Sequence, residues 1–350
     1  MGAPPRRLKA GPAELIGFGD LDFQRVPMLA RSSRGSPFMR WMPVGMPRIP
    51  PKHLDCVCYL YESEEKAEEG REFGGTGFFV GVPSRYPNAA FYYVVTNHHV
   101  AVAGGASVVR LNTKDGGVDT FSFEPHDWYF DTKYDIAVHP ISLNGDIHKF
   151  AAVPLVGLLS REKHEELKVG VGDDVYMVGR FIDHDGGATN RPAVRFGNIS
   201  VMPSPIEQPN GKMADAYCID LHSRSGYSGS PVFVYRTPGY DLEEQVAPDL
   251  ESSSLLLSGT SLLALLGIHF AQFPERWEIA SGASARKESS GVPLVTEGSY
   301  VNGLSGMTCV LPSWTIAEVL MSPTLQQGRD WGDDREQARR DREGHPPTPE

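Results

Sequence analysis

Cysteine is scarce in this sequence, with four residues among 350, and none of them forms a Cys-x-x-Cys pair. Cys56 and Cys58 stand two apart in a stretch that reads as a strand, so their side chains lie too far apart along the chain for an easy bridge. This usage argues against a disulfide framework and against a zinc site. We therefore expect no metal and no cofactor.

Long hydrophobic runs are also absent. The longest, residues 255–270, is interrupted by Ser258, Gly259, Thr260 and Ser261, and it is too short to span a bilayer. We expect buried strands there and no membrane partner. The N-terminal residues include basic side chains but lack the apolar segment of a secretory signal, which predicts a cytoplasmic protein.

Positive charge is in deficit, with a net charge of −11 and a pI near 5.5, which argues against nucleic acid as a partner. The charge is uneven, because residues 1–50 hold eight Lys or Arg against three Asp or Glu. We interpret this Pro- and Arg-rich stretch as an arm on an acidic body. A regulatory partner is a candidate to bind this arm. The dense charge of residues 323–350 predicts a disordered tail with at most a short solvated helix at 333–342.

The central residues, 51–322, alternate short β-branched and aromatic segments with Gly, Pro, Asn and Asp. This pattern favours an all-β, antiparallel barrel or sandwich over β-α-β units. Helices are expected only at 160–167, which begins with a Ser cap, and at 315–321. The expected strands are 57–61, 76–82, 91–96, 107–112, 120–124, 136–141, 175–181, 193–201, 216–221, 232–235, 262–270 and 307–311.

Three segments offer the groups that nucleophilic hydrolysis needs: a base, a carboxylate to orient it, and a hydroxyl. A strand that ends in Asn97-His98-His99 supplies an imidazole. Asp135 directly precedes an apolar strand. The run Gly226-Tyr227-Ser228-Gly229 flanks a serine with glycines, which allows a tight turn whose amides form an oxyanion hole.

Each of these segments has an ordinary structural interpretation when taken alone. Adjacent histidines in a loop are usually surface residues, an Asp before a strand is usually a turn or cap, and Gly-x-Ser-Gly is usually a turn. The order of the three segments, each at a strand boundary in a β-rich chain, is what favours catalysis.

The chain resembles the trypsin-like serine peptidases of the chymotrypsin fold, in the bacterial branch of the glutamyl endopeptidases and high-temperature-requirement proteases. The pieces that carry this resemblance are GTGFFV, VVTNHHV, DIAV, VGDDVYMVG, VRFGNIS, GYSGSPVF and LLGIHFA, in the family's order across residues 56–321. The resemblance implies two antiparallel six-stranded barrels, split near 160–170, with the active site between them. It further implies a C-terminal helix and poorly structured termini.

By that resemblance the protein is a serine endopeptidase whose substrate is a protein or peptide. His99 is the general base, Asp135 orients it, and Ser228 is the nucleophile of an acyl-enzyme. The amides of Gly226 and Ser228 hold the oxyanion. His98 stands one residue early and is expected to be structural, although the motif alone does not exclude an exchange of roles between the two histidines.

One departure from the family concerns activation. Members that are activated by proteolysis bury a new N-terminal amine against an Asp directly before the serine. Here that position is Tyr227, and no IVGG-like segment precedes the domain. We therefore expect an enzyme that is competent without N-terminal cleavage, or one that is gated in another way.

Substrate preference is predicted from a second segment. Gly267-Ile268-His269 matches the Gly-Ile-His of glutamyl endopeptidases, in which the histidine lines the S1 pocket, and Ser223 stands where those enzymes carry a pocket hydroxyl. An imidazole and a hydroxyl favour Glu or Gln at P1. The competing interpretation is that His269 is a core histidine on a barrel strand. Residues 234–261 read as an insertion and 272–306 as a mobile loop near the cleft.

Two other functions compete with the endopeptidase. A catalytically silent trypsin-like domain that acts as a protein-binding module has no need for all three of His99, Asp135 and Ser228. An esterase of the nucleophile-elbow class places its histidine after the serine and needs a parallel sheet with alternating helices, which this β-rich pattern lacks.

Overall fold

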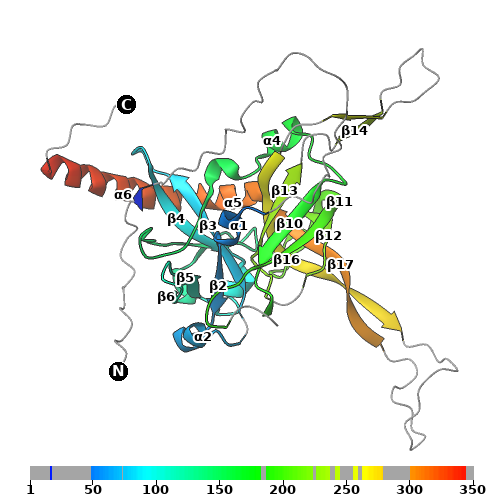
Figure 1. The fold of residues 1–350 in the computed structure, drawn as a ribbon, viewed down its shortest axis with the longest axis horizontal. Coiled ribbons are helices and arrows are strands. Elements are labelled where there is room, and N and C mark those ends of the chain that lie inside the picture. Colours follow the sequence, from blue (N-terminus) through cyan, green and yellow to red (C-terminus); the bar gives the residue numbers. More distant parts are fainter. Residues whose placement is uncertain are drawn as a thin grey trace, which may run out of the picture.

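The computed structural model describes residues 49–72, 74–182, 187–223, 226–236, 241–244, 255–258, 262–278 and 300–343, together with Ile16–Gly17. Two antiparallel β units stand side by side, with helices at the edges (Figure 1). The rest of the predicted arm, 1–50, and most of the predicted insertion lie outside the described residues.

The first sheet covers residues 57–154. Its strands follow the order β6-β5-β2-β3-β4-β8-β7, while β9 pairs with β3 in parallel and β1 pairs with β4. Its strands are β1 (Ile16–Gly17), β2 (Val57–Tyr61), β3 (Thr76–Pro83), β4 (Ala89–Thr96), β5 (Val108–Asn112), β6 (Val118–Ser122), β7 (Tyr129–Phe130), β8 (Ala137–Pro140) and β9 (Val153–Pro154).

The second barrel covers residues 174–312 and closes in the order β10-β11-β12-β17-β16-β13. Its strands are β10 (Asp174–Gly179), β11 (Ala193–Glu207), β12 (Met213–Asp220), β13 (Pro231–Arg236), β16 (Leu262–Glu278) and β17 (Tyr300–Pro312). A separate hairpin pairs β14 (Asp241–Glu244) with β15 (Leu255–Ser258).

The predicted all-β class with two antiparallel units is confirmed, and each of the predicted strands overlaps an observed one. The second unit is the predicted six-stranded barrel. The first unit differs from the predicted closed barrel, because its strands form an open path that ends at β6 and β7. The chain crosses from one unit to the other over residues 155–173.

Strand β2 shows how the sequence builds the core. Val57, Tyr59 and Tyr61 belong to a buried cluster that also contains Tyr176 and Leu311 of the second barrel. The alternate residues Cys58 and Leu60 belong to a cluster inside the first sheet. Since successive side chains of a strand point to opposite faces, one strand serves both cores. The two units therefore share a continuous apolar interface.

The helices lie at the edges of the two units, and all of those described except α6 are short. Ser160 Oγ accepts a hydrogen bond from Lys163 N at 3.2 Å, which is the predicted N-cap. Residues 64–69 also form a helix, because Ser63 caps it and Gly70 ends it at φ +68°. The helices are α1 (Pro51–Leu54), α2 (Glu64–Glu69), α3 (His98–Ala101), α4 (Arg161–Glu166), α5 (Ser313–Leu320), α6 (Pro323–Arg342) and the 3₁₀ turns at 125–127 and 155–157.

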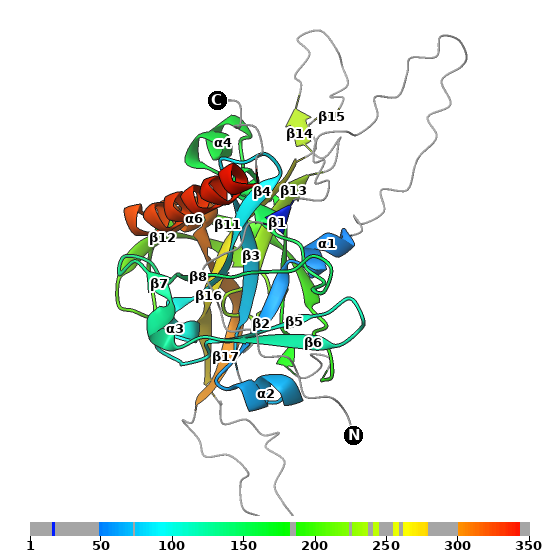
Figure 2. The same ribbon diagram turned by 90° about the vertical axis from the view of Figure 1, so that its left-hand side faces the viewer.

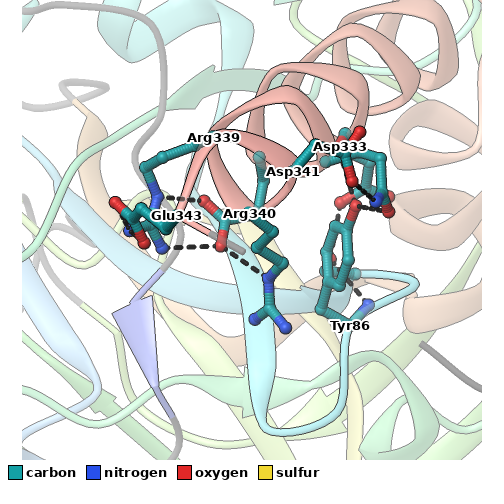
Figure 3. Close-up of polar contacts among 9 residues, drawn as sticks. Tyr86, Asp333, Arg339, Arg340, Asp341 and Glu343 are labelled. Carbon is teal, nitrogen blue, oxygen red and sulfur yellow. Dashed lines mark hydrogen bonds and ion pairs between the residues drawn. The ribbon is translucent and has the colours of Figure 1, made fainter. Parts of the chain in front are cut away.

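Helix α6 docks on the turn between β3 and β4, on the side of the first sheet away from the second barrel (Figures 1 and 2). Asp333 accepts hydrogen bonds from Ser84 Oγ at 2.5 Å and Arg85 N at 3.3 Å. Tyr86 points at the helix (Figure 3) and donates to the Asp333 carbonyl at 3.2 Å, with the Arg340 guanidinium 4.4 Å from its ring.

The prediction of a disordered tail is therefore wrong for residues 323–343. Arg329 is 3% exposed and donates to Tyr93 Oη at 3.1 Å and to the Leu320 carbonyl at 2.8 Å. This helix has no apolar face and docks through charged groups, with Tyr93 and Ser84 as partners more than 200 residues away in the chain. Only such partners make the burial of an arginine tolerable.

The predicted loop 272–306 also needs correction. β16 continues to Glu278 and β17 begins at Tyr300, so both ends of that stretch are paired strands. The long β16–β17 hairpin projects from the barrel (Figure 1). Residues 279–299 lie outside the described residues.

Candidate active site

His99 lies at the end of β4, in the short helix α3. The strand is anchored at that end by Thr96, whose hydroxyl donates to the Thr76 carbonyl at 2.8 Å. Asn97 Nδ2 donates to the Asp135 carbonyl at 2.9 Å. The His99 side chain is 29% exposed, so the imidazole is held by the sheet yet accessible to a reactant.

Asp135 stands two residues before the start of β8, and the antiparallel register Thr96↔Ala137 brings it beside His99. Its carboxylate is fully buried, with Oδ2 2.6 Å from His99 Nδ1 and Oδ1 accepting from His99 N at 2.9 Å. A carboxylate only accepts, so it holds a proton on Nδ1. That leaves Nε2 of the neutral ring as an acceptor.

His98 has a different environment. Its ring lies on Phe130 of β7, with centroids 4.5 Å apart. The carboxylate contact belongs to His99, so the geometry separates the two adjacent histidines that the motif alone did not.

Ser228 lies in a tight loop before β13. Gly226 and Gly229 have φ of +95° and +86°, which favours glycine. A Cβ on Gly229 would come within 2.0 Å of the Thr76 carbonyl oxygen, and one on Gly226 within 2.7 Å of Ile182. The two glycines are therefore required both by backbone conformation and by close packing.

Thr76 of the first sheet is hydrogen-bonded to this loop of the second barrel. Its backbone N donates to the Ser228 carbonyl at 2.9 Å, and its hydroxyl donates to the Gly226 carbonyl at 2.7 Å. Arg180 N donates in turn to the Thr76 hydroxyl at 3.0 Å. Thr76 is fully buried. In the sequence, Thr76 is recognisable only as a residue of the GTGFFV motif, which gives no indication of this role.

The amides of Gly226 and Ser228 are the predicted oxyanion donors. Within the part of the chain that the structure describes, neither of them donates to a protein acceptor, whereas Gly229 N donates to His269 O and Ser230 N to Tyr227 O, each at 2.9 Å.

Tyr227 is buried beneath the loop, and burial raises the pKa of its phenol. The Arg195 guanidinium lies 5.3 Å from its ring centroid. A Cβ on Gly179 of β10 would come within 2.8 Å of the ring. The residue before the serine is therefore packed into the barrel core as an aromatic side chain.

The predicted pocket residues Ser223 and His269 are in contact. Ser223 Oγ lies 2.7 Å from His269 Nε2, and His269 Nδ1 lies 3.3 Å from the Cys309 carbonyl. Each of the two residues is 2% exposed. Burial is the main cause that lowers the pKa of His269 to about 4, and the nearby His99 acts in the same direction. The neutral ring donates from Nδ1 to the carbonyl and accepts the Ser223 proton at Nε2.

Gly267, also predicted to contact substrate, lies in β16 opposite Pro312. A Cβ there would come within 2.0 Å of the Leu311 carbonyl oxygen, so packing between β16 and β17 already accounts for a glycine. The structure places it two residues from His269 but shows no further role.

Other candidate sites lie elsewhere or are absent from the described residues. A cavity of about 290 Å³ opens between α1, residues 151–157 and the second barrel, lined among others by His53, Phe233 and Leu265. It includes none of the predicted catalytic residues. Within the described ranges, no three His, Cys, Asp or Glu side chains gather as a metal site would require. Nor does any helix there have the length and apolar character to cross a membrane.

Comparison with known proteins gives one family model and several similar solved structures. Residues 75–237 match the model of the trypsin-like peptidase domain, and no curated protein matches the sequence. The chain is similar to the MamO protease domain of Magnetospirillum magneticum in its apo form, at 14% identity over 77% of this chain and 98% of that one, with a TM-score of 0.40. It is also similar to an inactive form of Rv3671c from M. tuberculosis H37Rv, at 17% identity over 77% and 86%, with a TM-score of 0.37.

The family match starts at the glycine before Thr76 and includes His99, Asp135 and Ser228. The segment that carries these three residues is therefore similar in sequence to a trypsin-like peptidase domain.

Proposed function

We propose that the protein is a serine endopeptidase that forms an acyl-enzyme on Ser228. The observation that carries the proposal is the buried Asp135 carboxylate 2.6 Å from His99 Nδ1, on a sheet joined through Thr76 to the loop of Ser228. A fully buried carboxylate with both oxygens on one histidine serves to orient and polarise that imidazole.

In the proposed reaction, Ser228 Oγ bonds to the scissile carbonyl carbon while His99 Nε2 takes the hydroxyl proton. The oxyanion receives hydrogen bonds from the Gly226 and Ser228 amides. The carbon–nitrogen bond then breaks, and His99 returns the proton to the leaving amine. Water repeats the sequence on the acyl-enzyme, which releases the new carboxylate and regenerates the serine.

The proposed P1 preference is Glu or Gln, as in the glutamyl endopeptidases that the sequence resembles. Its support is the contact between Ser223 and His269. When His269 is neutral, the Ser223 hydroxyl donates its proton to His269. The lone pairs of the Ser223 oxygen then suit the side-chain amide of a P1 Gln as donor. When His269 is protonated, the hydroxyl is released to donate to a carboxylate.

Competence without N-terminal cleavage is also proposed. Its support is Tyr227, which is fully buried in the position where proteolytically activated relatives carry an Asp. A packed ring has no need of a new amine as its partner. If the intact chain is inert and removal of residues 1–50 switches it on, this part of the proposal is wrong.

The deciding experiment is fluorophosphonate labelling of the purified chain beside Ser228→Ala, with the adduct located by mass spectrometry. Labelling confined to Ser228, together with peptide cleavage that Ser228→Ala lacks, is the expected result. A folded wild-type chain that neither labels nor cleaves would indicate the silent binding module instead. Profiling of a mixed peptide pool then tests P1, and products dominated by Arg or Lys at that site would overturn the acidic pocket.

A further inference from the structure

The turn of the β11–β12 hairpin of the second barrel reaches the loop that carries Asp135. Gln208 begins this turn, and its backbone is fixed by two hydrogen bonds: its N donates to Lys212 O at 2.9 Å, and Gly211 N donates to its carbonyl at 2.8 Å. Its side chain leaves the hairpin and is buried, with the residue 3% exposed. A buried amide on a hairpin turn needs partners, because an unmade hydrogen bond there is costly.

All the partners of this amide lie at the Asp135 loop or in its own turn. Oε1 accepts from the backbone N of Asp135 at 2.7 Å, while Nε2 donates to the Lys133 carbonyl at 3.0 Å and to the Lys212 carbonyl at 3.3 Å. The oxygen faces a donor and the nitrogen faces two acceptors, so this orientation of the amide satisfies every group. The segment from Lys133 to Asp135 is thus held at both ends by one side chain.

The same segment carries the carboxylate that contacts His99. Fixing the Asp135 backbone fixes a short side chain with two rotatable bonds, both of whose oxygens bind His99. A second support comes from helix α5, where Glu318 accepts from Tyr134 Oη at 2.7 Å and lies 3.6 Å from Lys133 Nζ. Both supports belong to the C-terminal half of the chain, which also carries Ser228.

We propose that Gln208 is a positioning residue for catalysis, which aligns the Asp135 carboxylate with His99 and ties that alignment to the barrel that bears Ser228. This inference rests on the proposed peptidase function. An amide is the side chain that fits, because it both accepts from Asp135 N and donates to Lys133 O. Glutamate would keep the acceptor, lose the donors and place a second negative charge beside Asp135.

The test compares Gln208→Met, Gln208→Glu and Asn210→Ala in the full chain. Met keeps the length and removes every side-chain hydrogen bond, whereas Asn210 is exposed and, among the described residues, its side chain accepts only from Lys212 N of the same turn, at 2.9 Å. Because a misplaced group costs up to about 100-fold in rate, we expect Gln208→Met to lower kcat by about 10- to 100-fold with little change in KM. Gln208→Glu loses less, and Asn210→Ala matches the wild type.

Two further measurements separate positioning from general damage. The rate of fluorophosphonate labelling at Ser228 follows kcat in every variant, while urea unfolding reports stability. In proton NMR, the signal of the His99 Nδ1 proton moves and exchanges faster in Gln208→Met than in Asn210→Ala, because its hydrogen bond to Asp135 is weakened.

Wild-type labelling rates in a folded Gln208→Met protein overturn the inference. If Gln208→Met does not fold, the same reading is taken from Gln208→Glu. If the wild type neither labels nor cleaves, the proposed function fails, and the NMR signal still decides the positioning role: an unchanged Nδ1 proton in the Gln208 variants overturns it.

Discussion

The two halves of this molecule divide the proposed active site unequally. The first sheet, an open path that ends at β6 and β7, carries His99 and Asp135 on its connections. The closed second barrel carries Ser228 and the Ser223–His269 pair. The base and its carboxylate therefore come from one half, while the nucleophile and the candidate specificity pocket come from the other.

Each half also holds the other's loop. Thr76 of the first sheet holds the Ser228 loop, whereas Gln208 and Glu318 of the second half hold the Asp135 loop. Such reciprocal bonds make the alignment of the site a property of the interface, and neither half would be expected to keep its loop in place alone.

The largest expected effect breaks the contribution of the first sheet. Asp135→Asn keeps the size of the side chain but presents an amide to His99 Nδ1, which favours the wrong tautomer. From the analogous change in a serine protease we expect kcat to fall by about 10⁴-fold. Steady-state kinetics on a peptide substrate, with circular dichroism to verify folding, provides the measurement. A loss below tenfold contradicts the role given to Asp135.

The next effect breaks the hold of the first sheet on the second barrel. Thr76→Val removes the hydroxyl and leaves the buried Gly226 carbonyl and Arg180 N without that partner. Each such loss costs about 1–3 kcal/mol. We expect lower unfolding free energy and slower labelling of Ser228, both restored by Thr76→Ser. If Val and Ser behave alike in urea unfolding and labelling, the hydroxyl has no such role.

A pH experiment sharpens the comparison, because the pocket belongs to the second barrel alone. With its pKa lowered to about 4 by burial, His269 is neutral in the empty enzyme between pH 6 and 8. A P1 Glu is ionised there and favours a protonated His269, so its binding takes up a proton. Lower pH favours that proton uptake, and it raises the affinity for the P1 Glu by at most about tenfold per pH unit.

The ratio of kcat/KM for Glu over Gln substrates should therefore rise as the pH falls from 8 to 6. The ratio cancels every pH effect on the catalytic steps that the two substrates share. A matched control is His269→Gln, in which the ratio should not vary with pH. A flat ratio in the wild type would contradict the proposed pocket.

The smallest expected effect concerns helix α6, which docks on the first sheet away from the site. Asp333→Ala removes the acceptor of Ser84 Oγ and Arg85 N and should lower the free energy of unfolding by about 1–2 kcal/mol. The control Asp334→Ala breaks a mostly exposed ion pair with Arg85, which is worth about 0–1 kcal/mol. Per folded molecule, labelling of Ser228 should not change. Equal destabilisation by the two variants would show that the buried contact adds nothing.

Local patterns predicted much of the fold. The alternation in β2, where Tyr59 and Leu60 face different cores, can be predicted from the sequence because it depends on neighbouring residues in the chain. Ser160 as a helix cap is legible for the same reason. Helix α6 was missed because Arg329 and Asp333 are buried against partners more than 200 residues away, which no local pattern contains.

The candidate site shows the same division. Motif order indicated His99, Asp135, Ser228, Ser223 and His269, and the structure brings His99 to Asp135 and Ser223 to His269. Thr76 and Gln208 carried no comparable signal. A threonine at the start of a strand and a glutamine in a turn are common, and only their partners give them significance.

The sequence by itself determined which reactive side chains are present and that each stands beside a strand, because alternation, turn glycines and motif order are properties of neighbouring residues. Only the tertiary structure decided which loops are bound together. An amide 73 residues along the chain from Asp135 becomes its hydrogen-bond partner because two separately formed β units meet across a shared apolar core. Interfaces of that kind depend on the packing of the whole chain and leave no periodic trace in it.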